Sequence, residues 1–147
     1  MTPDLIFSIA NNAVLPAWIL LAVAPRWKVT TWLVHSSAFS LVIAGIYGVV
    51  IAMGLGQAEG GMTSLAGVQQ LFANPLVALA GWLHYLAFDL FIGAWETRNA
   101  RRLAIPHWQV IPCLFFTLML GPVGLLLYFV VRWLHGHRTV PSDGSAG

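Results

Sequence analysis

The chain has 147 residues, of which 59% are hydrophobic and only 8% are charged. A soluble globular domain carries about 25% charged residues, so this composition predicts a chain whose main solvent is lipid. The seven lysines and arginines are scattered and form no basic stripe of the kind found in nucleic-acid-binding proteins. One cysteine, Cys113, excludes an internal disulfide and a CxxC metal site, and it leaves the redox compartment open.

Four apolar stretches approach or exceed the ~20 residues that a helical membrane span needs. We therefore predict an all-α fold, a four-helix transmembrane bundle that forms a single domain over residues 1–135. The predicted spans are residues 5–24, 30–54, 75–97 and 107–134, and residues 136–147 are expected to be a disordered tail. A signal peptide is the alternative for the first stretch, because Ala22-Val23-Ala24 resembles a cleavage site, but no basic residue precedes it.

The connections between the spans carry local signals of their own. Ser64 is a candidate helix cap, followed by an apolar face made of Leu65, Val68, Leu71 and Phe72. This pattern predicts a short interfacial helix between the second and third spans, with a disordered link as the alternative. Asn74 and Pro75 supply a cap and a first-turn proline for the third span. Gly121-Pro122 is expected to bend the fourth helix and to free carbonyls one turn earlier.

The basic residues predict an orientation. The first and third connections hold five of them, against two on the other side, Arg132 and Arg138; the five are Arg26, Lys28, Arg98, Arg101 and Arg102. Under the positive-inside rule this bias places both connections in the cytoplasm and both termini outside. We expect an integral protein of a bacterial inner membrane.

Ionisable side chains at membrane depth are costly, so they mark candidate functional sites. Asp89 lies near the middle of the third span, and His84 stands five positions before it, about 140° around the helix. Steps of three or four residues place one stripe of side chains on a common helix face that should contact protein. The stripe consists of Trp82, Tyr85, Asp89, Gly93 and Glu96.

Polar residues of the first two spans are expected to face the same interior as Asp89. We predict one cavity in which Asp89, His84 and His35 are catalytic, and which binds its ligand through Asn11, Asn12, Trp82 and Tyr85. Simpler roles remain open for most of these. Asp89 and the two asparagines are also suited to hydrogen bonds that join helices. His35 is also suited to a place at the membrane interface. Glu96 is also suited to a solvated helix end.

Several short motifs together resemble a known family. They are Ala13-Val14-Leu15-Pro16, Ala24-Pro25, Trp82-Leu83-His84 with Asp89-Leu90-Phe91, Cys113-Leu114-Phe115-Phe116 and Gly121-Pro122-Val123-Gly124. The sequence resembles the abscisic-acid-deficient-four, or neoxanthin-synthase-like, family over nearly the whole chain up to about Leu134. The resemblance implies a small membrane protein of xanthophyll metabolism, related to the plant protein required to convert violaxanthin to neoxanthin. This chain lacks the plastid transit extension of the plant pattern, which favours a bacterial or free-standing homologue.

The resemblance implies an isomerase that opens a carotenoid epoxide without a redox change. Such chemistry needs an acid for the departing oxygen and a base for a carbon-bound proton. Asp89 is the expected donor, and His84 or His35 the expected base. A carotenoid or similar isoprenoid lipid would enter sideways from the bilayer between kinked helices.

Other functions remain open from the sequence. A non-catalytic pigment- or lipid-binding partner of a carotenoid enzyme is one alternative, and a small proton-coupled transporter using Asp89 is another. We predict no cofactor; two histidines and one carboxylate would form a non-haem iron site, but the spacing is weak support. The expected partners are the lipid bilayer and an apolar ligand, with a homo-oligomer as an option and no nucleic acid.

Overall fold

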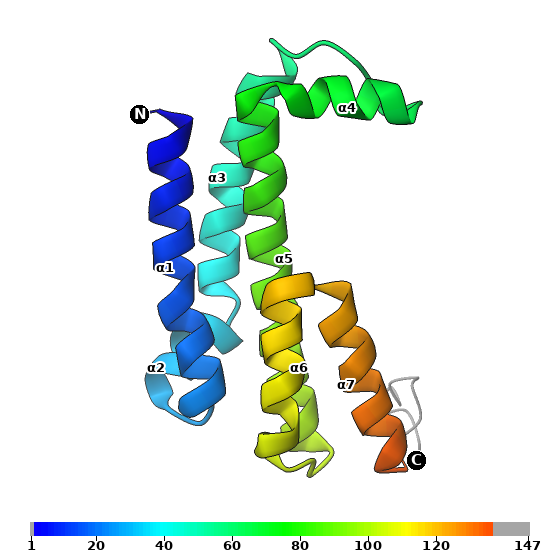
Figure 1. The fold of residues 1–147 in the computed structure, drawn as a ribbon. Coiled ribbons are helices and arrows are strands. Elements are labelled where there is room, and N and C mark those ends of the chain that lie inside the picture. The colour runs from blue at the N-terminus through cyan, green and yellow to red at the C-terminus, as the bar shows by residue number, and fades with distance from the viewer. Residues whose placement is uncertain (1, 137–147) are drawn as a thin grey trace, which may run out of the picture.

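The computed structural model describes residues 2–136, which contain helices and no strand. Residues 137–147, most of the predicted tail, lie outside the described part of the chain. Figure 1 shows α1, α3 and α5 running along one another, with a hairpin of two shorter helices beside α5. In chain order the elements are α1 (Pro3–Val23), α2 (Lys28–Thr30), the π-helical turn η1 (Thr31–His35), α3 (Ala38–Leu55), α4 (Leu65–Ala73), α5 (Pro75–Arg102), α6 (His107–Leu120) and α7 (Pro122–Leu134).

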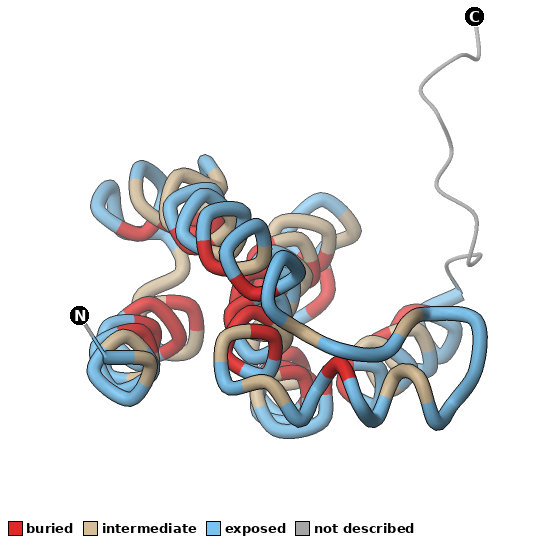
Figure 2. The backbone as a smooth tube through the Cα atoms, turned by 90° about the horizontal axis from the view of Figure 1, so that it is seen from above, coloured by how far each residue is buried: buried red, intermediate tan, exposed pale blue. Residues whose placement is uncertain are grey.

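Three helices are long and apolar enough to cross a membrane: Pro3–Val23, the nearly continuous Lys28–Leu55, and Pro75–Arg102. The third of these, α5, is the central helix. In the most apolar window of α5, 44% of the residues are buried, against 28% and 22% in the other two. Figure 2 shows the buried positions turned toward the middle of the assembly and the exposed ones outward. The outer helices therefore keep most of their apolar surface for lipid.

The second span is interrupted near its start. Thr31–His35 forms a π-helical turn, and Ser37 follows with a left-handed φ of 65°. Such turns commonly mark functional or structural irregularities inside helices. Here the Arg98 guanidinium of α5 donates a hydrogen bond of 2.7 Å to the carbonyl oxygen of His35, which is part of the irregular turn. The turn is therefore held in place by α5.

The predicted short helix between the second and third spans is present as α4. The Ser64 hydroxyl accepts a hydrogen bond of 3.1 Å from the Gly67 amide at the start of α4. Asn74 likewise caps α5, because its side-chain oxygen accepts from the amides of Leu76 and Val77 at 2.9 and 3.4 Å. In Figure 1, α4 lies across the end of α3 and α5 rather than along them. This orientation suits a helix at a membrane surface.

The predicted fourth span is not confirmed. Residues 107–134 form two helices of 14 and 13 residues, each only about 20 Å long, against a hydrocarbon core of about 30 Å. The chain reverses at Gly121, whose φ of 40° and ψ of −89° break the helix before Pro122. Hydropathy is continuous across this turn, so it does not distinguish a bent span from a hairpin. Figure 1 shows the hairpin tip reaching about halfway along α5.

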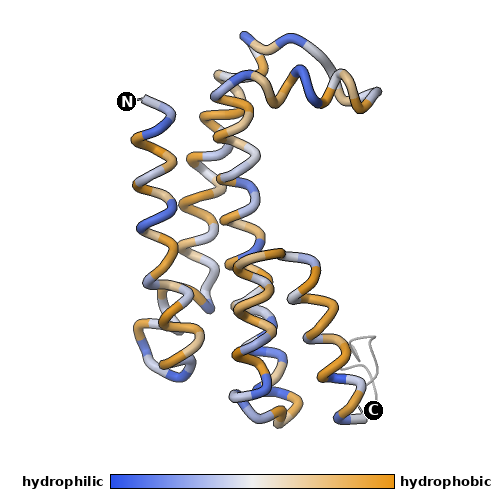
Figure 3. Tube along the Cα trace, in the orientation of Figure 1, coloured by the Kyte–Doolittle hydropathy of each residue, from blue (hydrophilic) through white to orange (hydrophobic). Residues whose placement is uncertain are grey.

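The hairpin also does not support the predicted placement of both termini on one side of the membrane. Figure 1 places the start of α1 and the end of α7 at opposite ends of the structure. Arg132 consequently lies at the same end as the other basic residues, and Figure 3 shows hydrophilic positions at the turns there. Within residues 2–136, all lysines and arginines gather at this end, hereafter the cationic end: Arg26, Lys28, Arg98, Arg101, Arg102 and Arg132.

Candidate functional site beneath the helical hairpin

The α6–α7 hairpin docks on α5 through polar groups. The Tyr85 hydroxyl of α5 donates a hydrogen bond of 2.6 Å to the Leu118 carbonyl oxygen of α6. That carbonyl lies four residues before Pro122, which has no amide hydrogen to offer it. The freed carbonyl predicted from Gly121-Pro122 is thus confirmed, and its partner is a residue of the predicted stripe.

Asp89 lies directly under the hairpin turn, one helical turn beyond Tyr85. A methyl group at Gly121 would approach the two Asp89 carboxylate oxygens to 2.8 and 3.2 Å, so only glycine fits. The Asp89 carboxyl interacts with the Tyr85 hydroxyl. Its Oδ2 atom is buried, and no group within residues 2–136 hydrogen-bonds to it. This carboxyl therefore retains hydrogen-bonding capacity.

Glu96 was missed as a buried group. The sequence favoured a solvated helix end, but its side chain is fully buried. The Thr117 hydroxyl of α6 lies 3.0 and 3.1 Å from the two Glu96 oxygens. Gly124 of α7 allows this arrangement, because a methyl group there would come within 2.1 Å of the Thr117 amide nitrogen. The signal available in sequence was the stripe itself, which places Glu96 on the face of Asp89.

A further polar contact closes the lower part of the hairpin. The Tyr128 hydroxyl of α7 donates a hydrogen bond of 2.7 Å to the Asn99 side-chain oxygen of α5. The Tyr128 ring also packs edge-on against Trp95, with ring centroids 5.4 Å apart. Both helices of the hairpin are therefore fixed to α5 by side-chain hydrogen bonds.

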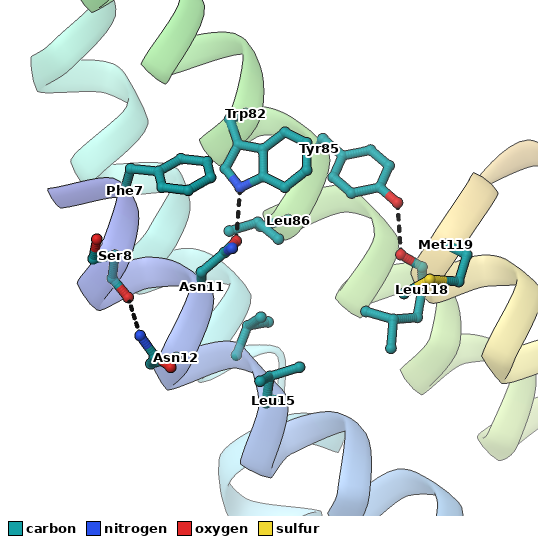
Figure 4. Close-up of a pocket in the computed structure, with 11 residues that line it drawn as sticks. Phe7, Ser8, Asn11, Asn12, Leu15, Trp82, Tyr85, Leu86, Leu118 and Met119 are labelled. Carbon is teal, nitrogen blue, oxygen red and sulfur yellow. Dashed lines mark hydrogen bonds between the residues drawn. The ribbon is translucent and has the colours of Figure 1, made fainter. Parts of the chain in front are cut away.

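A pocket opens beside the hairpin tip, between α1, α5 and the end of α6. Its volume is about 380 Å³, and all four predicted ligand-binding residues, Asn11, Asn12, Trp82 and Tyr85, line it. We call it the α1–α5 pocket. Figure 4 shows the Trp82 indole pointing its nitrogen at Asn11, a hydrogen bond of 2.8 Å, while Asn12 turns back to the carbonyl of Ser8.

Aromatic rings form one wall of the α1–α5 pocket. The Trp82 indole lies between Phe7 and Tyr85, with centroid distances of 5.5 and 5.2 Å. The remaining walls are largely aliphatic, from Val14, Leu15, Leu86, Leu118 and Met119. Leu15 and Met119 are exposed, so the pocket has an apolar edge.

His84 belongs to a different part of the molecule. It is exposed and stacks on Phe88 at 4.5 Å and near Tyr47 at 5.7 Å. Its pocket, about 470 Å³, is formed with α3 and α4 and contains neither Asp89 nor Tyr85. The predicted shared cavity is therefore wrong for His84. The separation of about 140° around α5 turns the two side chains toward different neighbours.

His35 caps the turn after α1. Its Nε2 atom lies 2.9 Å from the Pro25 carbonyl oxygen, and this contact requires the imidazole to donate. The last carbonyls of a helix need such partners, since no intrahelical amide reaches them. His107, for which the sequence indicated no role, acts likewise on the Ala22 carbonyl oxygen at 2.9 Å. The contacts of His35 are with the turn and not with Asp89.

The placement of the histidines bears on metal binding. Within residues 2–136, no group of three His, Cys, Asp or Glu side chains is close enough to hold a metal ion. The two histidines and one carboxylate proposed for non-haem iron lie in three separate surroundings. The arrangement instead offers a carboxyl and a phenol beside an apolar pocket.

Comparisons with known proteins give one family. Residues 5–128 match the family described as ABA4-like, ABA DEFICIENT 4-like. The chain is 23% identical over 137 residues to "Protein ABA DEFICIENT 4, chloroplastic" of Arabidopsis thaliana, with 86% of this chain and 60% of that protein covered. The chain thus spans about three fifths of the length of this relative. No solved structure matches the chain significantly.

The match covers α1 to α5, α6 and most of α7, and it includes both the α1–α5 pocket and the hairpin tip. The family resemblance stated from the motifs is confirmed by this match. The chain belongs to the ABA DEFICIENT 4-like family.

Proposed function

We propose that this chain is a multi-pass membrane protein that binds a xanthophyll or similar isoprenoid lipid in the α1–α5 pocket and isomerises an epoxide on it. The proposal draws on the family, whose resemblance implies neoxanthin formation, and on the site. The single observation that carries it is the pocket itself. Four residues chosen from the sequence as ligand contacts line one apolar cavity beside Tyr85 and Asp89.

The size of the pocket fits one end of a long ligand. Small-molecule pockets are typically about 300–1,000 Å³, and this one, at about 380 Å³, lies near the lower limit. An end ring would enter beside the Phe7, Trp82 and Tyr85 rings, while the polyene continues along the apolar outer surface. Asn11 and Asn12 are suited to orient ring oxygens by hydrogen bonds.

Asp89 and Tyr85 would supply the proton transfers. In the proposed reaction the Asp89 proton passes through the Tyr85 hydroxyl, turned from Leu118 to the ligand, and reaches the epoxide oxygen as its C–O bond breaks. A proton then leaves a carbon next to the cationic centre and returns by the same route, and the C–H electron pair becomes the new double bond. The carboxyl is regenerated, and no oxidant or reductant is required. One carboxyl takes both roles, because His84 and His35 lie elsewhere.

The test is expression of the full chain in cells that make defined epoxy-xanthophylls, followed by chromatography of total and protein-bound pigments. A new allenic or otherwise isomerised pigment that depends on the chain is the expected result. Bound but unaltered pigment would indicate that the chain is a pigment carrier and not an enzyme. If no new pigment forms and no pigment is bound, the proposal is contradicted. A transporter or an unrelated lipid protein would then be favoured.

A further inference from the structure

A larger cavity lies at the cationic end, where the end of α1 and the turn after it meet the connection between α5 and α6. We call it the basal pocket; its volume is about 690 Å³. Arg26, Trp27, Arg101 and His107 contribute its polar and aromatic lining, and Val23, Ala100, Ile105 and Pro106 contribute apolar walls. Nothing in the α1–α5 pocket or in the proposed reaction uses these residues.

Three carbonyl groups at and just after the end of α1 already have side-chain partners. The Ala22 oxygen pairs with His107 at 2.9 Å, the Ala24 oxygen accepts from the Thr30 hydroxyl at 2.7 Å, and the Pro25 oxygen pairs with His35 at 2.9 Å. These contacts reduce the attraction of this helix end for cations. No carboxylate of residues 2–136 lines the basal pocket.

The charged groups of the basal pocket are two guanidinium donors. Arg26 and Arg101 are exposed, and neither guanidinium forms a hydrogen bond or ion pair with another residue of the described chain. The Trp27 indole is 56% exposed, as expected of an aromatic ring at the level of lipid headgroups. A cavity lined by two guanidinium groups and by no carboxylate of residues 2–136 favours an anionic ligand, and guanidinium pairs well with phosphate oxygens.

We propose that the basal pocket binds the phosphate group of an anionic phospholipid. The guanidinium groups of Arg26 and Arg101 hold the phosphate from two different segments of the chain. The apolar walls receive the glycerol and the first part of an acyl chain, which a free phosphate ion does not have. Basic pockets between membrane helices on the cytoplasmic side bind lipid headgroups in this way.

The test uses the full chain purified in detergent, with native mass spectrometry to measure bound phosphatidylglycerol or phosphatidylcholine. Phosphatidylglycerol is expected to be preferred. Arg26→Gln or Arg101→Gln is each expected to weaken its binding about fivefold, the loss of about one hydrogen bond to the phosphate. Arg102→Gln is the matched control. It removes the same charge beside Arg101 but does not line the basal pocket, so binding is expected to stay unchanged.

A second pair of variants tests the pocket without changing charge. Trp27→Ala is expected to lower phosphatidylglycerol binding, whereas Trp32→Ala, exposed on η1 and outside the pocket, is not. Equal losses in Arg101→Gln and Arg102→Gln would overturn the proposal, because they would indicate a diffuse surface charge. So would equal binding of both lipids. Displacement of the lipid by inorganic phosphate at the same concentration would assign the pocket to free phosphate instead.

Discussion

Two carboxyl groups on one face of α5 have opposite surroundings. Glu96 is fully buried, and the Thr117 hydroxyl hydrogen-bonds to both of its oxygens. Asp89, two turns earlier, lies under the turn at Gly121 with one oxygen without a hydrogen-bond partner in the described chain, and it interacts with Tyr85 at the edge of a pocket. The comparison teaches that burial alone does not identify a reactive group. In the proposed function, Glu96 holds the hairpin and Asp89 is the reactive carboxyl.

The largest expected effect separates the two carboxyls by activity. Asp89→Asn removes the proton donor and is expected to lower pigment conversion at least about a hundredfold, as for loss of a general acid. Glu96→Gln keeps an oxygen that accepts from Thr117 and is expected to retain most of the conversion. Chromatography of pigments at matched amounts of folded protein measures both. Equal losses in the two variants would remove the distinction between them.

A second prediction tests how the hairpin is held over Glu96. Gly124→Ala places a methyl group within 2.1 Å of the Thr117 amide nitrogen, so the free energy of unfolding should fall by about 1–3 kcal/mol. Gly48→Ala is the control, because nothing lies within 4 Å of a methyl group there. Thermal unfolding in detergent compares the two. An unchanged melting temperature for Gly124→Ala would mean that α6 and α7 do not pack as described.

A third prediction concerns the contact at the hairpin tip. Tyr85→Phe removes the hydrogen bond to the Leu118 carbonyl and should lower the free energy of unfolding by about 1 kcal/mol. It should also lower conversion, because the proposed proton route passes through this hydroxyl. Tyr47→Phe is the control, since the Tyr47 hydroxyl forms no hydrogen bond with a residue in 2–136. Identical behaviour of both variants would argue against a special role for Tyr85.

The smallest effect is expected at His84. His84→Phe keeps an aromatic ring on Phe88 at an exposed position. The free energy of unfolding should therefore change by less than about 0.5 kcal/mol. Pigment conversion should remain, because the His84 pocket is separate from Asp89. Loss of pigment conversion in a folded His84→Phe protein would support the catalytic role predicted for His84 from the sequence.

Local signals in the sequence predicted local structure well. Ser64 and Asn74 cap α4 and α5 because a short polar side chain before an apolar run can bond only to the nearby amides. The Leu118 carbonyl was predictable for the same reason, since a proline removes one specific amide hydrogen. The stripe on α5 followed from helical periodicity, and it grouped Tyr85 with Asp89 correctly.

Long-range features were not predictable in this way. The reversal at Gly121 brings it against Asp89 on another helix, and hydropathy averages over the turn. The partners of His35 and His107 are backbone carbonyls at the end of α1, and no sequence pattern names a carbonyl as a partner. Glu96 lies near arginines in sequence, which favoured a solvated end, but the hairpin covers it. Tertiary packing decided each of these cases.

The most direct test asks whether residues 107–134 turn back as a hairpin, because Asp89 meets Gly121 only in that arrangement. The measurement is labelling of single cysteines at Thr2 and at His135 with a membrane-impermeant reagent in sealed vesicles, in a Cys113→Ser background. The two positions are expected to be labelled from opposite sides of the membrane. Labelling of both from the same side would contradict it, since residues 107–134 would then cross the bilayer and the site at the hairpin tip would not exist.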